Sequence, residues 1–276
     1  MIKRWLIVAL VIAIYSMGSG CSFETVQSAA QALKQKDEQG QNVRNYFANF
    51  NGTFVIRDIG NGTTIVINEK QANKKLSPMS TFEILNSLIA LETGVIQGEN
   101  AVRKWDGSKY PEEEWNRDHT LASALTNSVE WYYQSLAREI GEKKMKSYIE
   151  RVGYGNNDVS GGIDKFWLDS TLRISALEQV DFLTKLYKEE LPFHKRATKT
   201  AKKIMVLKSS GDFVFAGKTG SRNNELGWFV GYITKGDSTY VFATNIEGTE
   251  DATGFKARQI TEEILKDFQL FPSNPE

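Results

Sequence analysis

Three separated segments of the chain carry side chains that together could form a serine acyl-transfer site. Ser80 opens a Ser-Thr-Phe-Glu tetrapeptide, Ser128 lies midway, and the triplet Lys218-Thr219-Gly220 ends a β-rich run far downstream. A nucleophilic hydroxyl needs a base beside it, and a second hydroxyl with an ammonium can relay protons and stabilise developing charge. Each segment alone has an ordinary explanation, since serine is a common helix N-cap. Their order and spacing together predict an acyl-transfer site.

Glu83 departs from the usual form of such a site. In Ser-x-x-Lys sites a lysine stands three residues after the serine, one helical turn away on the same face. Here that position holds Glu83, and a second carboxylate, Glu130, follows two residues after Ser128. If both carboxylates shared a partly buried site, repulsion and desolvation would raise the pKa of one and leave the other as an ionised base.

Composition restricts the class of protein. The chain has 276 residues, with 34 basic and 34 acidic side chains and 41% hydrophobic residues. A formal net charge of zero argues against a nucleic-acid partner, and the apolar content suffices for a sizeable core. The two histidines, His119 and His194, lie in no cluster with metal-ligand spacing, so we expect neither a metal nor another cofactor.

The first residues predict export from the cytoplasm. A basic start precedes the apolar run 5–15, small residues follow, and Cys21 is the only cysteine. We therefore expect a signal peptide over 1–20 and a polar tether over 21–45, with the folded domain over 46–276. Lipid attachment at Cys21 would be its only link to a membrane, whereas an accidental cysteine in a cleaved signal is the alternative. We expect an extracytoplasmic monomer without disulfides.

The order of elements predicts an α+β fold with two lobes. β-rich runs stand near both ends of the chain, and Asn61-Gly62 between the first two predicts a hairpin turn. The expected strands are 52–58, 63–68, 212–216, 226–234 and 239–245. Apolar spacing predicts helices over 80–93, 121–140, 142–152, 176–186, 195–208 and 261–268. We expect one antiparallel sheet of five or more strands, covered by the terminal helix and joined to a helical lobe.

The chain resembles class D β-lactamases, within the wider group of penicillin-recognising serine enzymes. The resemblance extends from about residue 51 to about residue 268. It rests on the motifs named above and on four further segments: Pro-Met-Ser-Thr-Phe at 78–82, Tyr-Gly-Asn at 154–156, the segment 166–175, and Gly-Trp-Phe-Val-Gly at 227–231. It implies the β-lactamase/transpeptidase fold and a β-lactam or peptidoglycan-like small molecule as substrate.

The resemblance also implies roles for single residues. Ser80 would attack the lactam carbonyl, and its N–H and that of Ser221 would form the oxyanion hole. Ser128 and Lys218 would relay a proton to the departing nitrogen. The substrate carboxylate would be held by Thr219, helped by Arg258 or Lys256, while Gly220 lets the strand approach closely. Trp167 corresponds to a tryptophan that steadies the base.

The same resemblance makes Glu83 and Glu130 the two departures from the family pattern. The family's lysine carries a carbon dioxide adduct that acts as a long carboxylate base, and glutamate cannot form it. We expect the shorter Glu83 not to reach Ser80 directly unless a water or Glu130 fills the gap. The predicted function is a β-lactamase of reduced activity that confers antibiotic resistance. The alternatives are a non-hydrolytic β-lactam or peptidoglycan sensor and an inactive relative.

Overall fold

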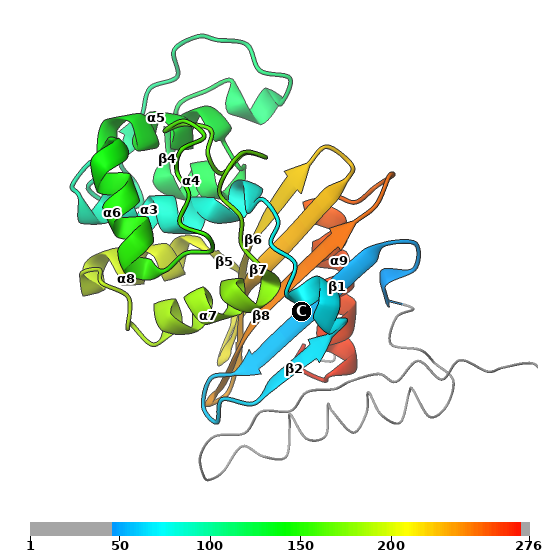
Figure 1. Cartoon of the computed structure of the whole chain (residues 1–276). Coiled ribbons are helices and arrows are strands. Elements are labelled where there is room, and N and C mark those ends of the chain that lie inside the picture. Colours follow the sequence, from blue (N-terminus) through cyan, green and yellow to red (C-terminus); the bar gives the residue numbers. More distant parts are fainter. Residues whose placement is uncertain (1–45, 272–276) are drawn as a thin grey trace, which may run out of the picture.

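The computed structural model describes residues 46–271, which form a sheet flanked by helices (Figure 1). The predicted signal peptide (1–20), the tether (21–45) with Cys21, and residues 272–276 lie outside the described residues. Within the described part, no helix is long and apolar enough to cross a membrane.

A six-stranded antiparallel sheet has the order β2-β1-β8-β7-β6-β5. Its strands are β1 (Asn51–Asp58), β2 (Thr64–Ile67), β5 (Val206–Ser210), β6 (Phe213–Arg222), β7 (Leu226–Lys235) and β8 (Ser238–Glu247). A separate pair joins β3 (Val102–Arg103) and β4 (His119–Thr120). The five expected strands and the Asn61-Gly62 turn are confirmed, because Gly62 N donates to Asp58 O at 2.9 Å and closes the first hairpin.

The helices occupy the middle of the chain and its end. They are α2 (Glu69–Ala72), the 3-10 turn η2 (Met79–Phe82), α3 (Glu83–Glu92), the 3-10 turn η3 (Glu113–Trp115), α4 (Leu121–Thr126), α5 (Glu130–Ile140), α6 (Glu142–Val152), α7 (Ala176–Tyr187), α8 (Lys195–Ile204) and α9 (Gly254–Asp267). Helices α3 to α6 and α8 form the helical lobe in Figure 1, and α9 lies along the sheet.

Three predicted helices need correction. The expected helix 121–140 is two helices, because Ser128 adopts a left-handed backbone (φ 50°) between α4 and α5. The expected helix 195–208 ends at Ile204, and residues from Val206 pair with β6 as an edge strand instead. The last helix begins at Gly254, earlier than predicted, where the Thr253 side chain caps it by accepting from Lys256 N.

Two hydrophobic cores lie on opposite faces of the sheet. Val55 belongs to the core shared with the helical lobe, whereas its neighbour Phe54 belongs to the core shared with α9. We call these the lobe core and the α9 core. Successive residues of a strand point to opposite faces, so β1 contributes to both. The sheet is thus buried on both sides, and β6 runs at the junction of sheet and lobe where the site residues meet.

Candidate active site

Ser80 lies on the 3-10 turn that begins the long helix, and the backbone of Trp167 holds this turn in place. Met79 N donates to Trp167 O at 3.1 Å, and Ser77 Oγ donates to the same carbonyl at 2.9 Å. Met79 itself has a positive φ of 49°. The indole of Trp167 is buried and stacks on Phe82, with ring centroids 5.3 Å apart. The half-buried Ser80 is thereby presented to a cleft.

The cleft has a volume of about 440 Å³ and lies between the helical lobe and the end of β6. It is lined by Met79, Ser80, Glu112, Trp115, Ser128, Glu130, Leu168, Thr219, Gly220, Ser221, Arg222 and Asn223. The structure therefore brings together six residues predicted from the sequence. Trp167, which was predicted to steady the base, is not among the lining residues, and its carbonyl supports the turn beneath them.

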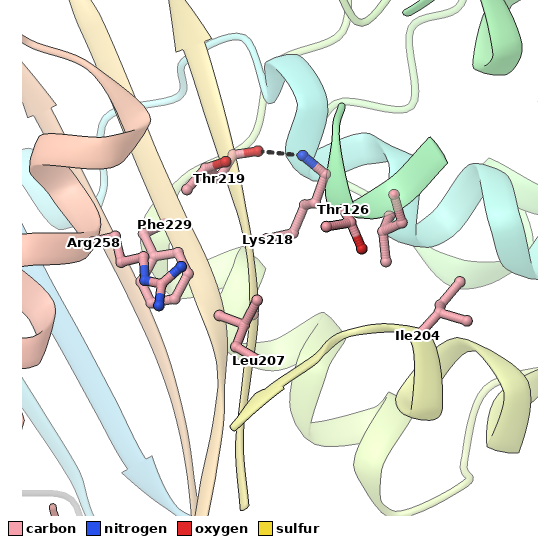
Figure 2. Close-up of a pocket in the computed structure, with 9 residues that line it drawn as sticks. Thr126, Ile204, Leu207, Lys218, Thr219, Phe229 and Arg258 are labelled. Atoms are coloured by element: carbon pink, nitrogen blue, oxygen red, sulfur yellow. Dashed lines mark hydrogen bonds between the residues drawn. The ribbon is translucent and has the colours of Figure 1, made fainter. Parts of the chain in front are cut away.

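Lys218 and Glu83 are buried beneath the cleft and form a cluster with Ser128, which lines it. The Lys218 ammonium donates to Ser128 Oγ and, at 2.9 Å, to the carbonyl of Thr219, the latter drawn in Figure 2. It lies 3.4 Å from Glu83 Oε2, which is an ion-pair distance, longer than a strong charge-assisted hydrogen bond. The Lys218 and Glu83 side chains are only 4% and 2% exposed, so neither charge is screened by water. The left-handed backbone of Ser128 turns this residue toward the ammonium.

Glu83 lies near Ser80, whose side chain is one of the groups that influence its pKa, and the expected bridging water stays a prediction. Burial raises the pKa of Glu83 to about 7, against the opposing effects of the Lys218 charge and of a hydrogen bond with the Ser80 side chain. This proximity arises because η2 passes straight into α3, which begins at Glu83. Burial also lowers the pKa of Lys218, and the neighbouring Glu83 opposes that shift.

Glu130 does not pair with Glu83. Its carboxylate accepts from Gln134 Nε2 at 2.9 Å and faces the cleft. Burial, and then the charge of Glu112, raise the pKa of Glu130, while Glu130 has the smallest effect on the pKa of Glu83. Of the two expected causes, desolvation is the largest contribution to the raised pKa of Glu83, and repulsion by Glu130 acts in the same direction but is the smallest.

Gly220 and Ser221 fix the strand against its surroundings. A Cβ on Gly220 would lie 3.0 Å from Pro78 O and 3.2 Å from Ser80 N, so β6 passes very close to the nucleophile's turn. The Ser221 hydroxyl accepts from Gly254 N at 2.8 Å and ties the strand to the start of α9. This proximity agrees with the predicted oxyanion hole from the N–H groups of Ser80 and Ser221, which stays a prediction.

Arg258 lines a neighbouring pocket of about 70 Å³ and not the cleft (Figure 2). Its Nε donates to Glu262 Oε1 at 2.8 Å, and its guanidinium lies 5.9 Å from the ring centre of Phe229. Thr219 lines both spaces and is the link between them. The predicted cooperation of Thr219 and Arg258 on a carboxylate thus requires a ligand that reaches along β6.

Several cleft residues were missed by sequence reasoning. Arg222 pairs with Asp169 at 2.8 Å, and so joins the hairpin after β6 to the loop that carries Leu168. Leu168 and Asp169 lie in the segment 166–175 that supports the resemblance, and Arg222 lies two residues after Lys-Thr-Gly, but no pattern indicated that they meet. Among residues 46–271 no group of three or more acidic, histidine or cysteine side chains could hold a metal.

Comparisons with known proteins agree with this architecture. Residues 26–266 match the family of the penicillin binding protein transpeptidase domain. The chain is 45% identical to the probable β-lactamase YbxI of Bacillus subtilis (strain 168), over 98% of this chain and 100% of that protein. A class D β-lactamase structure from Bacillus subtilis is similar with a TM-score of 0.81 and 47% identity, covering 84% of this chain and 97% of that one.

A receptor domain is also similar. The C-terminal domain of the Bacillus licheniformis BlaR penicillin-receptor gives a TM-score of 0.78 at 37% identity, covering 83% of this chain and 95% of that one. The sequence match, the fold and the arrangement of Ser80, Ser128 and Lys218 lead to one conclusion. The chain belongs to the class D β-lactamase family.

Proposed function

We propose that the protein is a class D serine β-lactamase that opens β-lactams through an acyl-enzyme on Ser80, with the Glu83 carboxylate as its base. The observation that carries this proposal is the arrangement under the cleft, in which Lys218 pairs with the buried Glu83 and donates to Ser128, while the pKa of Glu83 responds to the nearby Ser80 side chain. A base whose pKa lies near 7 is well matched to neutral pH, because about half of it is ionised and it can still release the proton.

Each proton in the proposed reaction has a named donor and acceptor. Ser80 Oγ attacks the lactam carbonyl while its proton passes to Glu83. When the C–N bond breaks, the ring nitrogen takes a proton from Ser128, and Ser128 takes one from Lys218. Protonated Glu83 then returns its proton to Lys218, 3.4 Å away, which restores the carboxylate and the ammonium. Water attacks the ester carbonyl while its proton passes to Glu83, and Glu83 gives this proton to the Ser80 oxygen as it leaves. The carboxylate belongs to the side chain itself, so residue 83 needs no carbon dioxide adduct and turnover is independent of bicarbonate.

Thr219 supports substrate binding in this proposal. It lines both the cleft and the pocket of Arg258, so a substrate carboxylate placed at Thr219 lies toward that guanidinium. The oxyanion of the intermediate is assigned to the N–H groups of Ser80 and Ser221.

The test is to incubate the purified domain with a penicillin and follow the mass of the Ser80 adduct over time, with Ser80→Ala as the control. We expect an adduct that forms and decays, with a decay rate that bicarbonate does not change. No adduct on the wild-type chain would contradict the proposal. The double variant Glu83→Lys with Glu130→Val should make turnover faster and bicarbonate-dependent.

A non-hydrolytic sensor is the second candidate, and the likeness to the BlaR penicillin-receptor domain favours it. At neutral pH part of the Glu83 population is protonated and cannot activate water. An adduct that forms but persists would identify this function in the same experiment.

Export and lipid attachment at Cys21 are also proposed, from the basic start, apolar run and small residues that precede this cysteine. Expression of the full chain in a Gram-positive host should yield a membrane-bound protein labelled by radioactive palmitate. Cys21→Ser should lose the label and move to the culture medium. An unlabelled wild-type chain would contradict the anchor.

A further inference from the structure

A second hollow, of about 250 Å³, lies on the helical lobe and shares no lining residue with the cleft. One wall is a single face of α5, formed by Trp131, Gln134, Ser135 and Arg138, which are spaced as neighbours on one side of a helix. The opposite wall is the segment 103–110, beginning in β3. Nothing in the proposed reaction uses this space.

The lining of the hollow carries more cations than carboxylates. Its charged side chains are the cations Arg103, Lys104 and Arg138 and one carboxylate, Asp106, which is the only acidic residue among the described lining residues. The acidic partners of the three cations do not line the space: Arg103 pairs with Glu139, Lys104 with Asp118, and Arg138 with Asp164. Each cation is thus paired with a carboxylate that lies outside the hollow, while three of the four charged side chains that line the hollow itself are positive.

The two guanidinium groups retain unused hydrogen-bonding capacity. Arg138 contacts Asp164 through Nη1 alone, at 2.7 Å. Arg103 donates to Glu139 through Nη2 and reaches Ser135 Oγ only at 3.5 Å, while its Nε is buried with no hydrogen-bond partner among the described residues. An arginine has five N–H donors in a planar fork, and a buried donor without a partner is costly. An oxyanion in the hollow would accept from the Nη donors of Arg103 and Arg138 that their carboxylate partners leave unused.

We propose that this hollow binds a small oxyanion, a phosphate or a carboxylate, between Arg103 and Arg138. Planar guanidinium groups recognise both anions through paired N–H donors. Tyr110 and Trp131 also line the space and give it an aromatic side, so the anionic group can carry a small apolar substituent.

The hollow is connected to the cleft through α5. Gln134 lines the hollow and donates to Glu130, which lines the cleft. Trp131 lines the hollow, and its Nε1 donates at 2.9 Å to the carbonyl of Trp115, another cleft residue. An anion that draws on Gln134 or Trp131 thus acts on groups in the cleft, and any coupling must be reciprocal. Only this coupling rests on the proposed function; the binding itself does not.

The binding test is isothermal titration calorimetry of the domain with inorganic phosphate and, in a second arm, with acetate, at matched ionic strength in sodium chloride. We expect one site, weakened at least about tenfold in Arg138→Ala, because a charge-assisted hydrogen bond is lost. Asp164→Asn keeps Arg138 and removes its competing partner, so it should bind more tightly. Lys146→Ala, an exposed change on α6, should bind as the wild type does.

The two titrations distinguish a phosphate site from a carboxylate site. Heat of binding with phosphate alone, with acetate alone or with both shows which oxyanion the hollow accepts. Unchanged phosphate binding in Arg138→Ala together with unchanged binding in Asp164→Asn would place the anion elsewhere and overturn the proposal. So would the absence of heat in both arms. Ser80→Ala should bind phosphate normally, so a failure of β-lactam chemistry leaves this result intact.

The coupling is tested by the rate of adduct formation on Ser80 with and without saturating phosphate. We expect phosphate to change this rate in the wild type and to have no effect in Gln134→Leu, which cannot hydrogen-bond to Glu130. Equal rates with and without phosphate in the wild type would refute the coupling while leaving the binding site itself standing.

Discussion

The most consequential residue of the molecule is Glu83, whose burial places its pKa near 7 beside Ser80. As a base it must be ionised, so we expect the acylation rate to rise with pH through about 7. It should fall again at alkaline pH as Lys218, whose pKa burial lowers, loses its proton. Stopped-flow measurement of the acylation rate between pH 5 and pH 10 records both limbs. The pKa values that it gives are apparent values of the coupled Glu83–Lys218 pair.

Glu83→Gln is the variant that tests this assignment. It should lose the acidic limb and about 10²-fold to 10⁴-fold in acylation rate, the usual effect of removing a general base. Glu113→Gln, on the exposed turn η3, should leave the profile unchanged. If the Glu83→Gln variant kept the wild-type pH profile, another group would have to accept the proton.

The same pKa has a consequence for stability. Burial raises the folded-state pKa of Glu83 to about 7 from an ordinary value of 4.5. The folded state therefore holds this proton more tightly than the unfolded chain does. The contribution of protonated Glu83 to the free energy of unfolding is fully present below about pH 4.5 and is lost as pH rises through about 7. We expect Glu83→Gln to reduce this fall in the free energy of unfolding, measured by urea denaturation at several pH values. An equal slope in both proteins would contradict the burial argument.

For single residues, the sequence was enough to predict the main reactive side chains but not the contacts between them. The spacing of Ser80, Ser128 and Lys218 predicted residues that do meet at the cleft. How near Glu83 comes to Ser80 depends on the 3-10 turn over Met79–Phe82, which helical periodicity does not reveal. Arg222 escaped notice because its partner Asp169 is 53 residues away, and charge pairing at that separation has no local signature.

At the scale of elements, the close passage of β6 beside η2 sets the geometry of attack. Gly220→Ala would place a Cβ against backbone atoms of Pro78 and Ser80. The turn that carries Ser80 would have to move by a few tenths of an ångström to accommodate it. We expect acylation to slow by about tenfold, since small misplacements of a nucleophile are costly. Gly98→Ala is the matched control, because the nearest atom there, on Arg196, is 4.0 Å away. Equal acylation rates in the two variants would show that the strand does not position Ser80.

The boundaries of the strands and helices were predicted only in part from the sequence. Five of the six sheet strands and the hairpin at Asn61-Gly62 follow from local patterns and were predicted, although β6 extends to Arg222, beyond the expected end at 216, and the edge strand β5 was expected to be helical. The break between α4 and α5 was not, because apolar spacing continues across it while Ser128 takes a left-handed backbone. That conformation lets Ser128 accept from Lys218, a contact made by a residue 90 positions away.

At the scale of the molecule, the sheet is shared by two cores, and this predicts one cooperative unfolding unit. Leu88 lies in the lobe core and Ile264 in the α9 core, both fully buried. Leu88→Ala and Ile264→Ala should each lower the free energy of unfolding by about 2–5 kcal/mol. The double variant should be additive within about 0.5 kcal/mol, because the two residues lie in separate cores on opposite faces of the sheet.

Guanidinium denaturation followed by near-UV and far-UV circular dichroism measures these changes. We expect coincident single transitions in all variants, since every strand of the six-stranded sheet carries side chains into both cores or hydrogen-bonds to one that does. A biphasic curve in Ile264→Ala, with the lobe surviving the loss of α9 packing, would show instead that the two cores fold independently. Because the cleft is built from both the lobe and the sheet, it would then be lost at a lower denaturant concentration than the lobe.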